Sequence, residues 1–259
     1  MIESPRITVF GAGCIGRRIA RAVVDGELPY TLAAVCDIDQ AAAKGLAADF
    51  APEAQVLDLD RAAACADVVV EAAAGAVVPA VVAACRRAHS AHANPGNVLV
   101  MSVGGLLGVD DLNAPGPVIN VPSGAVGGLD AVQSLAVAGL DEVRLISRKP
   151  PAGLGMELTE EKVLFEGTAA EVIKLYPKNV NVAIALSLAG LGAEKTLVKL
   201  VADPKVDRNT HHITAHGPAG EIEFTSRNTA FPENPRTSYL AALSAISSLR
   251  RLAAQLQVG

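Results

Sequence analysis

Ile7-Thr8-Val9-Phe10-Gly11-Ala12-Gly13-Cys14-Ile15-Gly16 is the stretch that decides the fold of the N-terminal half. Ile7 to Phe10 predict a buried strand, and Arg17 to Val24 predict the helix that follows the three glycines. In a GxGxxG turn, the first glycine permits the tight bend, the second lets the backbone approach a pyrophosphate, and the third lets helix and strand pack closely. The helix N-terminus supplies amide donors to the phosphates. We therefore expect a dinucleotide site, rather than an ordinary glycine-rich turn, formed by Gly11, Gly13, Cys14, Ile15 and Gly16.

An acidic residue follows the second predicted strand, Leu32 to Cys36. Asp37 stands 21 positions after Gly16, where the fingerprint expects a carboxylate that binds the ribose hydroxyls. Its charge would repel a 2′-phosphate, which favours NAD. NADP stays open because Arg17 and Arg18 lie close in sequence, and Asp37 alone could also be a turn or helix-cap carboxylate.

Short apolar runs alternate with alanine-rich helical stretches over residues 7 to 121. This alternation predicts a doubly wound parallel sheet, and hence a Rossmann domain over residues 1–121. Its remaining strands are expected at Val68 to Glu71, Val98 to Val103 and Val118 to Val121.

A second α/β (α+β) domain with a mixed sheet is expected over residues 122–235, after the glycine-rich segment 122–128. Helices are expected at 169–176 and 181–191, and strands at Glu142 to Ser147, Lys162 to Glu166, Thr196 to Ala202, His211 to Ala215 and Glu221 to Ser226. Leucines at helical spacing predict one long helix from Arg236 to Gln257, with Thr237 and Ser238 as N-caps. We expect this terminal segment, 236–259, to pack back near the Rossmann domain.

Composition excludes several classes of function. A net charge of −5 and a pI near 5.6 lack the basic excess of nucleic-acid-binding proteins. The uncharged run from Ala72 to Cys85 is too short for a membrane span and predicts a buried helix. No signal-peptide pattern precedes the first strand, so we expect a cytoplasmic protein.

The cysteine and histidine spacing does not favour a metal site. The four cysteines form no CxxC pair and are expected to be reduced, buried thiols. His89 and His92 have a spacing that metal ligands can have, but their polar surroundings favour a loop.

Six polar segments carry a family resemblance in their order and spacing. They resemble the L-aspartate dehydrogenases, and with the fingerprint the resemblance covers nearly the whole chain. The stretch between Pro151 and Leu164 is shorter than is usual in that family. The segments are ProSerGlyAlaValGlyGlyLeuAsp (122–130), ArgLysProPro (148–151), LeuPheGluGlyThrAla (164–169), TyrProLysAsnValAsnValAla (176–183), AlaAspProLysValAspArgAsnThrHis (202–211) and AsnProArgThrSerTyrLeuAlaAlaLeuSerAla (234–245).

The resemblance implies a role for particular residues. The histidine of the family's AsnXxxHis motif is the catalytic acid/base, which is His211 here; an exposed strand histidine is the alternative. His212 would point to the opposite face of the strand. Nicotinamide contacts are implied for Ala125 and Asn181, which could otherwise be a plain turn residue and a helix cap. Substrate carboxylates need cations, and the motif segments offer Lys178, Arg208 and Arg236, with Thr237 near the cleft.

The implied reaction is oxidative deamination of L-aspartate with NAD(P)⁺ to iminoaspartate, then to oxaloacetate and ammonia, in a homodimer without metal. In the family, the imine can feed NAD biosynthesis. Two other readings stay open. One is a reductase of dihydrodipicolinate or homoserine dehydrogenase type, which would differ from residue 122 onward. The other is a non-catalytic NAD(H) sensor, which would need no acid/base at position 211.

Overall fold

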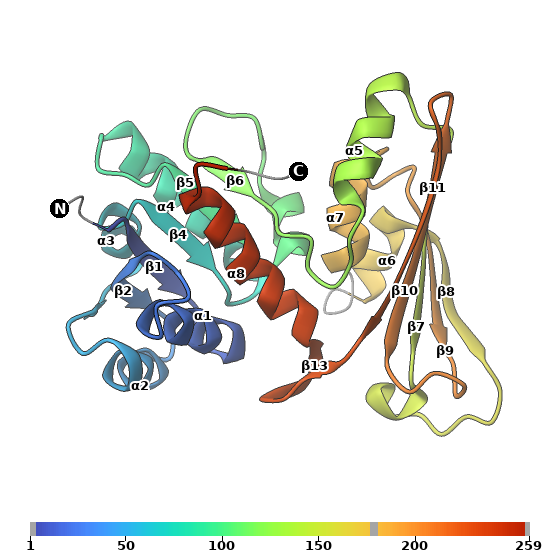
Figure 1. Ribbon diagram of the computed structural model, residues 1–259, viewed down its shortest axis with the longest axis horizontal. Helices are drawn as coiled ribbons and strands as arrows, with labels where there is room; N and C mark the ends of the chain where they lie inside the picture. The colour runs from blue at the N-terminus through green and yellow to red at the C-terminus, as the bar shows by residue number, and fades with distance from the viewer. Residues whose placement is uncertain (1–3, 177–180, 257–259) are drawn as a thin grey trace. The chain divides into compact units, whose positions relative to one another are not determined.

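The computed structural model describes residues 4–176 and 181–256, without the side chains of Pro235 and Arg236. The chain forms two compact units. The first comprises Met1–Pro122 together with Ala245–Val258, and the second comprises Ser123–Ser244. The two units are described separately below (Figure 1).

The first unit is a six-stranded sheet in which every pairing is parallel. Its order, β3-β2-β1-β4-β5-β6, is that of the dinucleotide-binding Rossmann fold. The strands are β1 (Arg6–Phe10), β2 (Thr31–Cys36), β3 (Gln55–Val56), β4 (Val68–Glu71), β5 (Asn97–Val100) and β6 (Val118–Asn120). The helices are α1 (Cys14–Val24), α2 (Gln40–Phe50), α3 (Leu59–Ala64) and α4 (Val78–Ser90), with short 3₁₀ turns at Gly75–Val77 and Val103–Gly108.

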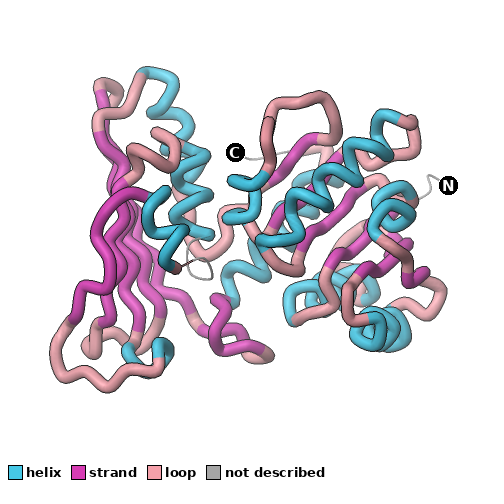
Figure 2. Tube along the Cα trace, turned by 180° about the vertical axis from the view of Figure 1, so that it is seen from behind, coloured by secondary structure: helices cyan, strands magenta, loops and turns pink. Residues whose placement is uncertain are grey.

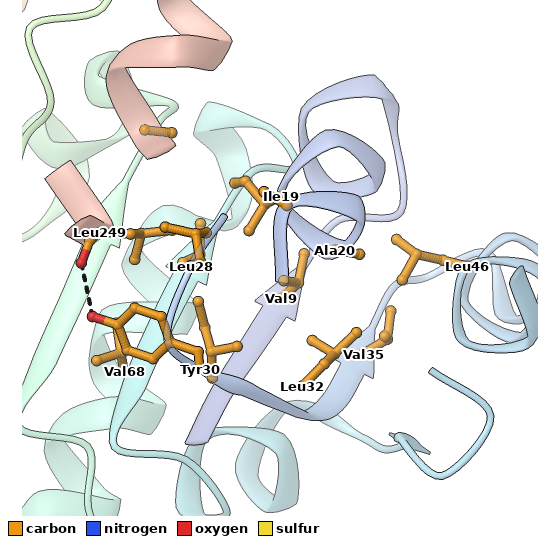
Figure 3. Packing of buried hydrophobic residues seen from close by; sticks show 14 of the residues in the cluster. Val9, Ile19, Ala20, Leu28, Tyr30, Leu32, Val35, Leu46, Val68 and Leu249 are labelled. Carbon is orange, nitrogen blue, oxygen red and sulfur yellow. Dashed lines mark hydrogen bonds between the residues drawn. The ribbon is translucent and has the colours of Figure 1, made fainter. Parts of the chain in front are cut away.

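Helices cover both faces of this sheet, so its strands are apolar on both sides. On one face, α1 and α2 pack against β1 and β2, and the C-terminal part of α8 (Tyr239–Ala253) joins the same core. Ile246 and Leu249 of α8 are buried there, and the Tyr30 hydroxyl donates a hydrogen bond to the Leu249 carbonyl at 2.9 Å (Figure 3). The end of the chain thus completes the hydrophobic core of the N-terminal unit.

The second unit holds a five-stranded sheet of order β11-β10-β7-β9-β8. The pairing of β7 with β9 is parallel and the other pairings are antiparallel, so the sheet is mixed. Helices α5, α6 and α7 gather on one side of it (Figures 1 and 2). The strands are β7 (Glu142–Lys149), β8 (Lys162–Thr168), β9 (Leu197–Ala202), β10 (Asn209–Gly217) and β11 (Gly220–Asn228); the helices are α5 (Leu129–Ala138), α6 (Ala169–Leu175) and α7 (Asn181–Ala189), with a 3₁₀ turn at Pro151–Leu154.

The predicted fold class is confirmed, but several predicted elements differ from those in the structure. The strand expected at Val98 to Val103 ends at Val100, because a 3₁₀ turn begins at Val103. The apolar run from Ala72 forms helix only from Val78, since Pro79 suits the first turn of a helix and Gly75 lies in a separate 3₁₀ turn. His89 lies in α4 rather than in a loop, where its Nδ1 is 3.0 Å from the Pro95 carbonyl oxygen.

The predicted C-terminal helix also begins later and ends earlier than expected. Residues 234–238 form strand β13 (Asn234–Ser238), which pairs with β12 (Ala230–Phe231) in a small hairpin. The ring of Tyr239 stacks on that of Phe231 with centroids 5.3 Å apart. Thr237 is therefore a strand residue and not an N-cap, and its hydroxyl oxygen accepts a hydrogen bond from the Asn234 amide at 3.1 Å. Ser238 directly precedes α8, but its buried Oγ has no hydrogen-bond partner in the described structure and makes no cap bond.

Candidate active site

The three fingerprint glycines are required for different reasons. A Cβ at Gly11, whose φ is +103°, would lie 2.6 Å from the backbone of Ala72, and one at Gly16 would lie 1.9 Å from the Gly11 carbonyl oxygen. Packing within the chain therefore explains both. A Cβ at Gly13 would meet no protein atom within 4 Å, although Gly13 is the N-cap of α1. Packing within the protein therefore does not require a glycine at position 13. Close approach of a bound pyrophosphate to the backbone does explain it.

Asp37 is fixed beside this turn by the backbone. Its Oδ2 accepts a hydrogen bond from the Ala12 amide at 2.7 Å, and its Oδ1 accepts one from the Asp39 amide at 2.8 Å. Each oxygen keeps a further lone pair, so the carboxylate can also accept from ribose hydroxyls. Glycine turn, helix N-terminus and carboxylate together fit an NAD(P) cofactor.

The two arginines after the fingerprint have acidic partners of their own. Arg17 forms an ion pair with Asp49 and lies over the Phe50 ring, with its guanidinium carbon 5.2 Å from the centroid. Arg18 forms a two-pronged ion pair with Glu27 at 3.0 and 3.1 Å. These partnerships compete with any binding of a 2′-phosphate.

In the second unit, His211 is buried on the helix-covered face of the sheet. It lies on β10 directly opposite Ser147 of β7 and is 6% exposed. The Ser147 Oγ is 2.8 Å from Nδ1 of the imidazole, so the ring is held by one hydrogen bond on that side. His212 projects from the opposite face, where its Nδ1 is 2.9 Å from the Thr225 hydroxyl. The strand alternation thus separates the two histidines, as expected.

Burial keeps the His211 imidazole neutral at physiological pH. Desolvation, with a smaller contribution from the positive charge of Lys149, lowers the pKa of His211 to about 4. Burial also lowers the pKa of the half-buried Lys149 ammonium. The neutral imidazole has a free lone pair with which it can accept a proton, although the lowered pKa makes it a weaker base than an exposed histidine.

Two side chains of β11 donate hydrogen bonds to the turn that contains Ala125. The Ala125 carbonyl oxygen accepts a hydrogen bond from the Ser226 hydroxyl at 2.9 Å and another from the Asn228 amide at 2.8 Å. Ser226 lies directly opposite His211 in the β10–β11 pairing. One sheet face therefore holds both the imidazole and the groups that fix Ala125.

The other predicted site residues lie at separate places in the second unit or outside the described residues. Asn181 is exposed at the start of α7. Arg208 is exposed and forms a two-pronged ion pair with Asp207 at 2.8 and 2.5 Å. Thr237 bonds Asn234, as described above. Lys178 and the Arg236 side chain lie outside the described residues.

Ser147, Ser226 and Asn228 were missed by the sequence reasoning, and Lys149 was quoted within the ArgLysProPro segment but not selected as a site residue. The available signal was a strand face that changes from apolar to polar along β7, where Val143 and Leu145 are followed by Ser147 and Lys149. Polar residues on a strand face usually indicate that the face is exposed to solvent. Only the packing of the helices in the structure shows that this face is covered.

Within the described residues, no group of three or more His, Cys, Asp or Glu side chains is placed to hold a metal ion. The four cysteines are free, but only Cys85 is fully buried, so the expectation of buried thiols holds for one of them. No helix in the described part of the chain is long and apolar enough to cross a membrane.

Comparison with known proteins assigns a different match to each half of the chain. Residues 130–252 match the family described as aspartate dehydrogenase, C-terminal, and residues 11–113 match the NAD binding domain of homoserine dehydrogenase. The match in the C-terminal half separates this chain from the homoserine dehydrogenase type.

Full-length relatives agree with the C-terminal match. The chain is 40% identical to L-aspartate dehydrogenase of Methanocella arvoryzae over 98% of this chain and 99% of the relative. It is 39% identical to L-aspartate dehydrogenase of Bradyrhizobium diazoefficiens, with coverage of 98% and 94%. The crystal structure of aspartate dehydrogenase from Thermotoga maritima superposes with a TM-score of 0.76 at 27% identity, covering 98% of this chain and 99% of that one. The chain therefore belongs to the L-aspartate dehydrogenase family.

Proposed function

We propose that this protein is an NAD(P)-dependent L-aspartate dehydrogenase in which His211 is the catalytic acid/base. The observation that supports this role most strongly is the buried, neutral imidazole held by Ser147 on the covered face of the second sheet. The full-length likeness to L-aspartate dehydrogenases supports the choice of substrate.

The cofactor would be held by the first unit. Gly11, Gly13 and Gly16, with the first-turn residues Cys14 and Ile15, present the backbone to the pyrophosphate, and Asp37 accepts from the ribose. Ala125 and Asn181 are the proposed contacts of the nicotinamide. When bound, the cofactor accepts a hydride from C2 of the substrate.

His211 supplies the proton chemistry. With the proton on Nδ1, the ring donates to Ser147 Oγ, and Nε2 keeps a lone pair. Nε2 then accepts a proton from the substrate ammonium, so that the nitrogen lone pair can form the C=N bond as the hydride leaves C2. The product iminoaspartate takes up water at C2 and releases ammonia to give oxaloacetate. Once the imidazolium has passed its first proton to solvent, the same Nε2 can accept the proton of the attacking water.

Two alternatives are disfavoured by specific observations. A reductase of homoserine or dihydrodipicolinate type would share the N-terminal unit, but the C-terminal half matches aspartate dehydrogenase. A non-catalytic NAD(H) sensor is disfavoured because the full-length relatives are L-aspartate dehydrogenases.

The direct test is to incubate the purified protein with NAD⁺ or NADP⁺ and a panel of amino acids while following absorbance of the reduced cofactor. Activity with L-aspartate and not with L-homoserine is expected, together with stoichiometric release of ammonia. Reduction with another amino acid, and none with L-aspartate, would refute the proposed function.

Assembly, location and pathway are separate proposals. A homodimer is favoured because closed twofold assemblies are the commonest oligomers of soluble enzymes. Sedimentation that gives only the monomer mass at every working concentration would contradict it. A cytoplasmic location and a supply of iminoaspartate to NAD biosynthesis stay predictions from the sequence.

A further inference from the structure

A lysine that the sequence reasoning did not select lies two residues beyond Ser147 on β7. Alternate residues of a strand share a face, so Val143, Leu145, Ser147 and Lys149 form one row. The first three are buried on the helix-covered side, and Ser147 contacts His211. Lys149 therefore starts from the same face as the imidazole, about 7 Å along the strand from Ser147.

The backbone of Lys149 is also held by the neighbouring strand β9. Lys149 pairs with Ala202 of β9, and its carbonyl oxygen accepts a hydrogen bond from the Asp203 amide at 2.9 Å. The preceding residue, Arg148, points to the other face and binds Asp203 and Glu161 there, at 2.9 and 2.6 Å. The two adjacent cations therefore serve opposite sides of the sheet, and only Lys149 shares a face with His211.

The Lys149 ammonium is partly desolvated and close enough to His211 to act on its protonation. Lys149 is half-buried, burial lowers its pKa, and its charge disfavours protonation of His211. A positive charge on the same face as the proposed catalytic base suits a substrate that carries negative charge.

L-aspartate carries two carboxylates. Because the protein has a net charge of −5, binding them requires cationic side chains placed at the site. Among the cations expected from the sequence, Arg208 already forms a bidentate ion pair with Asp207, which competes with binding of a substrate carboxylate. Building on the proposed function, we propose that Lys149 is the cation that binds a carboxylate group of L-aspartate beside His211.

The test compares wild-type enzyme with Lys149→Met, Lys149→Arg and the control Lys199→Met. Lys199 lies on β9 of the same sheet, on the opposite face, paired with Glu166 at 2.8 Å, so its replacement removes the same charge without touching the site. Steady-state kinetics give KM for L-aspartate and for NAD⁺ separately. Calorimetry of succinate binding to the NADH-loaded enzyme gives a readout that needs no turnover, because succinate has both carboxylates and no amine.

Lys149→Met should raise KM for L-aspartate about ten- to a hundredfold and weaken succinate binding by a similar factor, the range of a charge-assisted hydrogen bond. KM for NAD⁺ should change less than about threefold, Lys149→Arg should recover part of the loss, and Lys199→Met should match wild type. Unchanged KM for L-aspartate and unchanged succinate affinity in Lys149→Met would overturn the proposal, as would an equal loss in Lys199→Met. If the wild-type enzyme does not oxidise L-aspartate, the proposed function fails, and the succinate measurement alone decides the role of Lys149.

Discussion

Replacing His211 with glutamine should remove a specific part of the acid sensitivity of the protein. The pKa of His211 is lowered from 6.5 to about 4 in the folded state, chiefly by burial. A pKa difference of one corresponds to about 1.4 kcal/mol, so lowering the pKa from 6.5 to about 4 amounts to about 3.5 kcal/mol at most. Because folding lowers the pKa of this base, its contribution to the unfolding free energy is lost as the pH falls. Above pH 6.5 both states are neutral at this residue and the stability is complete, whereas between pH 6.5 and 4 only the unfolded chain takes up the proton.

Wild-type protein should therefore lose about 2.5 kcal/mol more of its unfolding free energy than His211→Gln when the pH is lowered from 7.5 to 4.5. Urea denaturation followed by circular dichroism at both pH values measures this difference, and carboxylates that titrate in both proteins cancel. His212→Gln is the matched control, because that ring lies on the exposed face of the same strand, and it should follow wild type. Equal losses in wild type and His211→Gln, within about 1 kcal/mol, would refute the buried, neutral imidazole.

Three further outcomes are expected. Ser147→Ala should lower kcat about three- to tenfold and leave KM for NAD⁺ unchanged, since it removes one hydrogen bond that orients the imidazole; an unchanged kcat would contradict this role. Gly13→Val should weaken NADH binding more than about tenfold in a fluorescence titration while keeping the melting temperature, whereas Gly16→Ala should lower the melting temperature because its Cβ would clash with the Gly11 carbonyl. The enzyme should prefer NAD⁺ to NADP⁺ in kcat/KM, and Asp37→Ala should reduce that preference; a wild-type preference for NADP⁺ would show that Arg17 or Arg18 overrides the carboxylate.

The fold of the first unit could be predicted in detail because the sequence signals that determine it lie close together in the chain. A strand, three spaced glycines and an acid after the next strand specify the order of a Rossmann sheet, and the conserved hand of its crossovers leaves few other arrangements. The two-residue strand β3 and the β12–β13 hairpin were missed, because such short elements depend on pairing partners rather than on periodicity.

The candidate site was only partly accessible from sequence. His211 could be selected through a motif, but its neighbours Ser147 and Lys149 lie more than sixty positions earlier in the chain and meet it only through the register of β7 and β10. The same holds for Ser226 and Asn228, which reach the Ala125 carbonyl across about a hundred residues. Strand register is set by the packing of the whole sheet, and no local pattern reveals it.

The assignment of His211 as acid/base is tested most directly by kcat with L-aspartate in His211→Ala and His212→Ala, with NADH affinity and circular dichroism measured alongside. His211→Ala should lose about 10²- to 10⁴-fold in kcat, yet bind NADH as wild type does, because the glycine turn and Asp37 are unchanged. His212→Ala should stay within about threefold of wild type, since its ring lies on the other face of β10. If His211→Ala keeps more than about a tenth of the wild-type kcat, a margin set by the same range, His211 is not the catalytic acid/base.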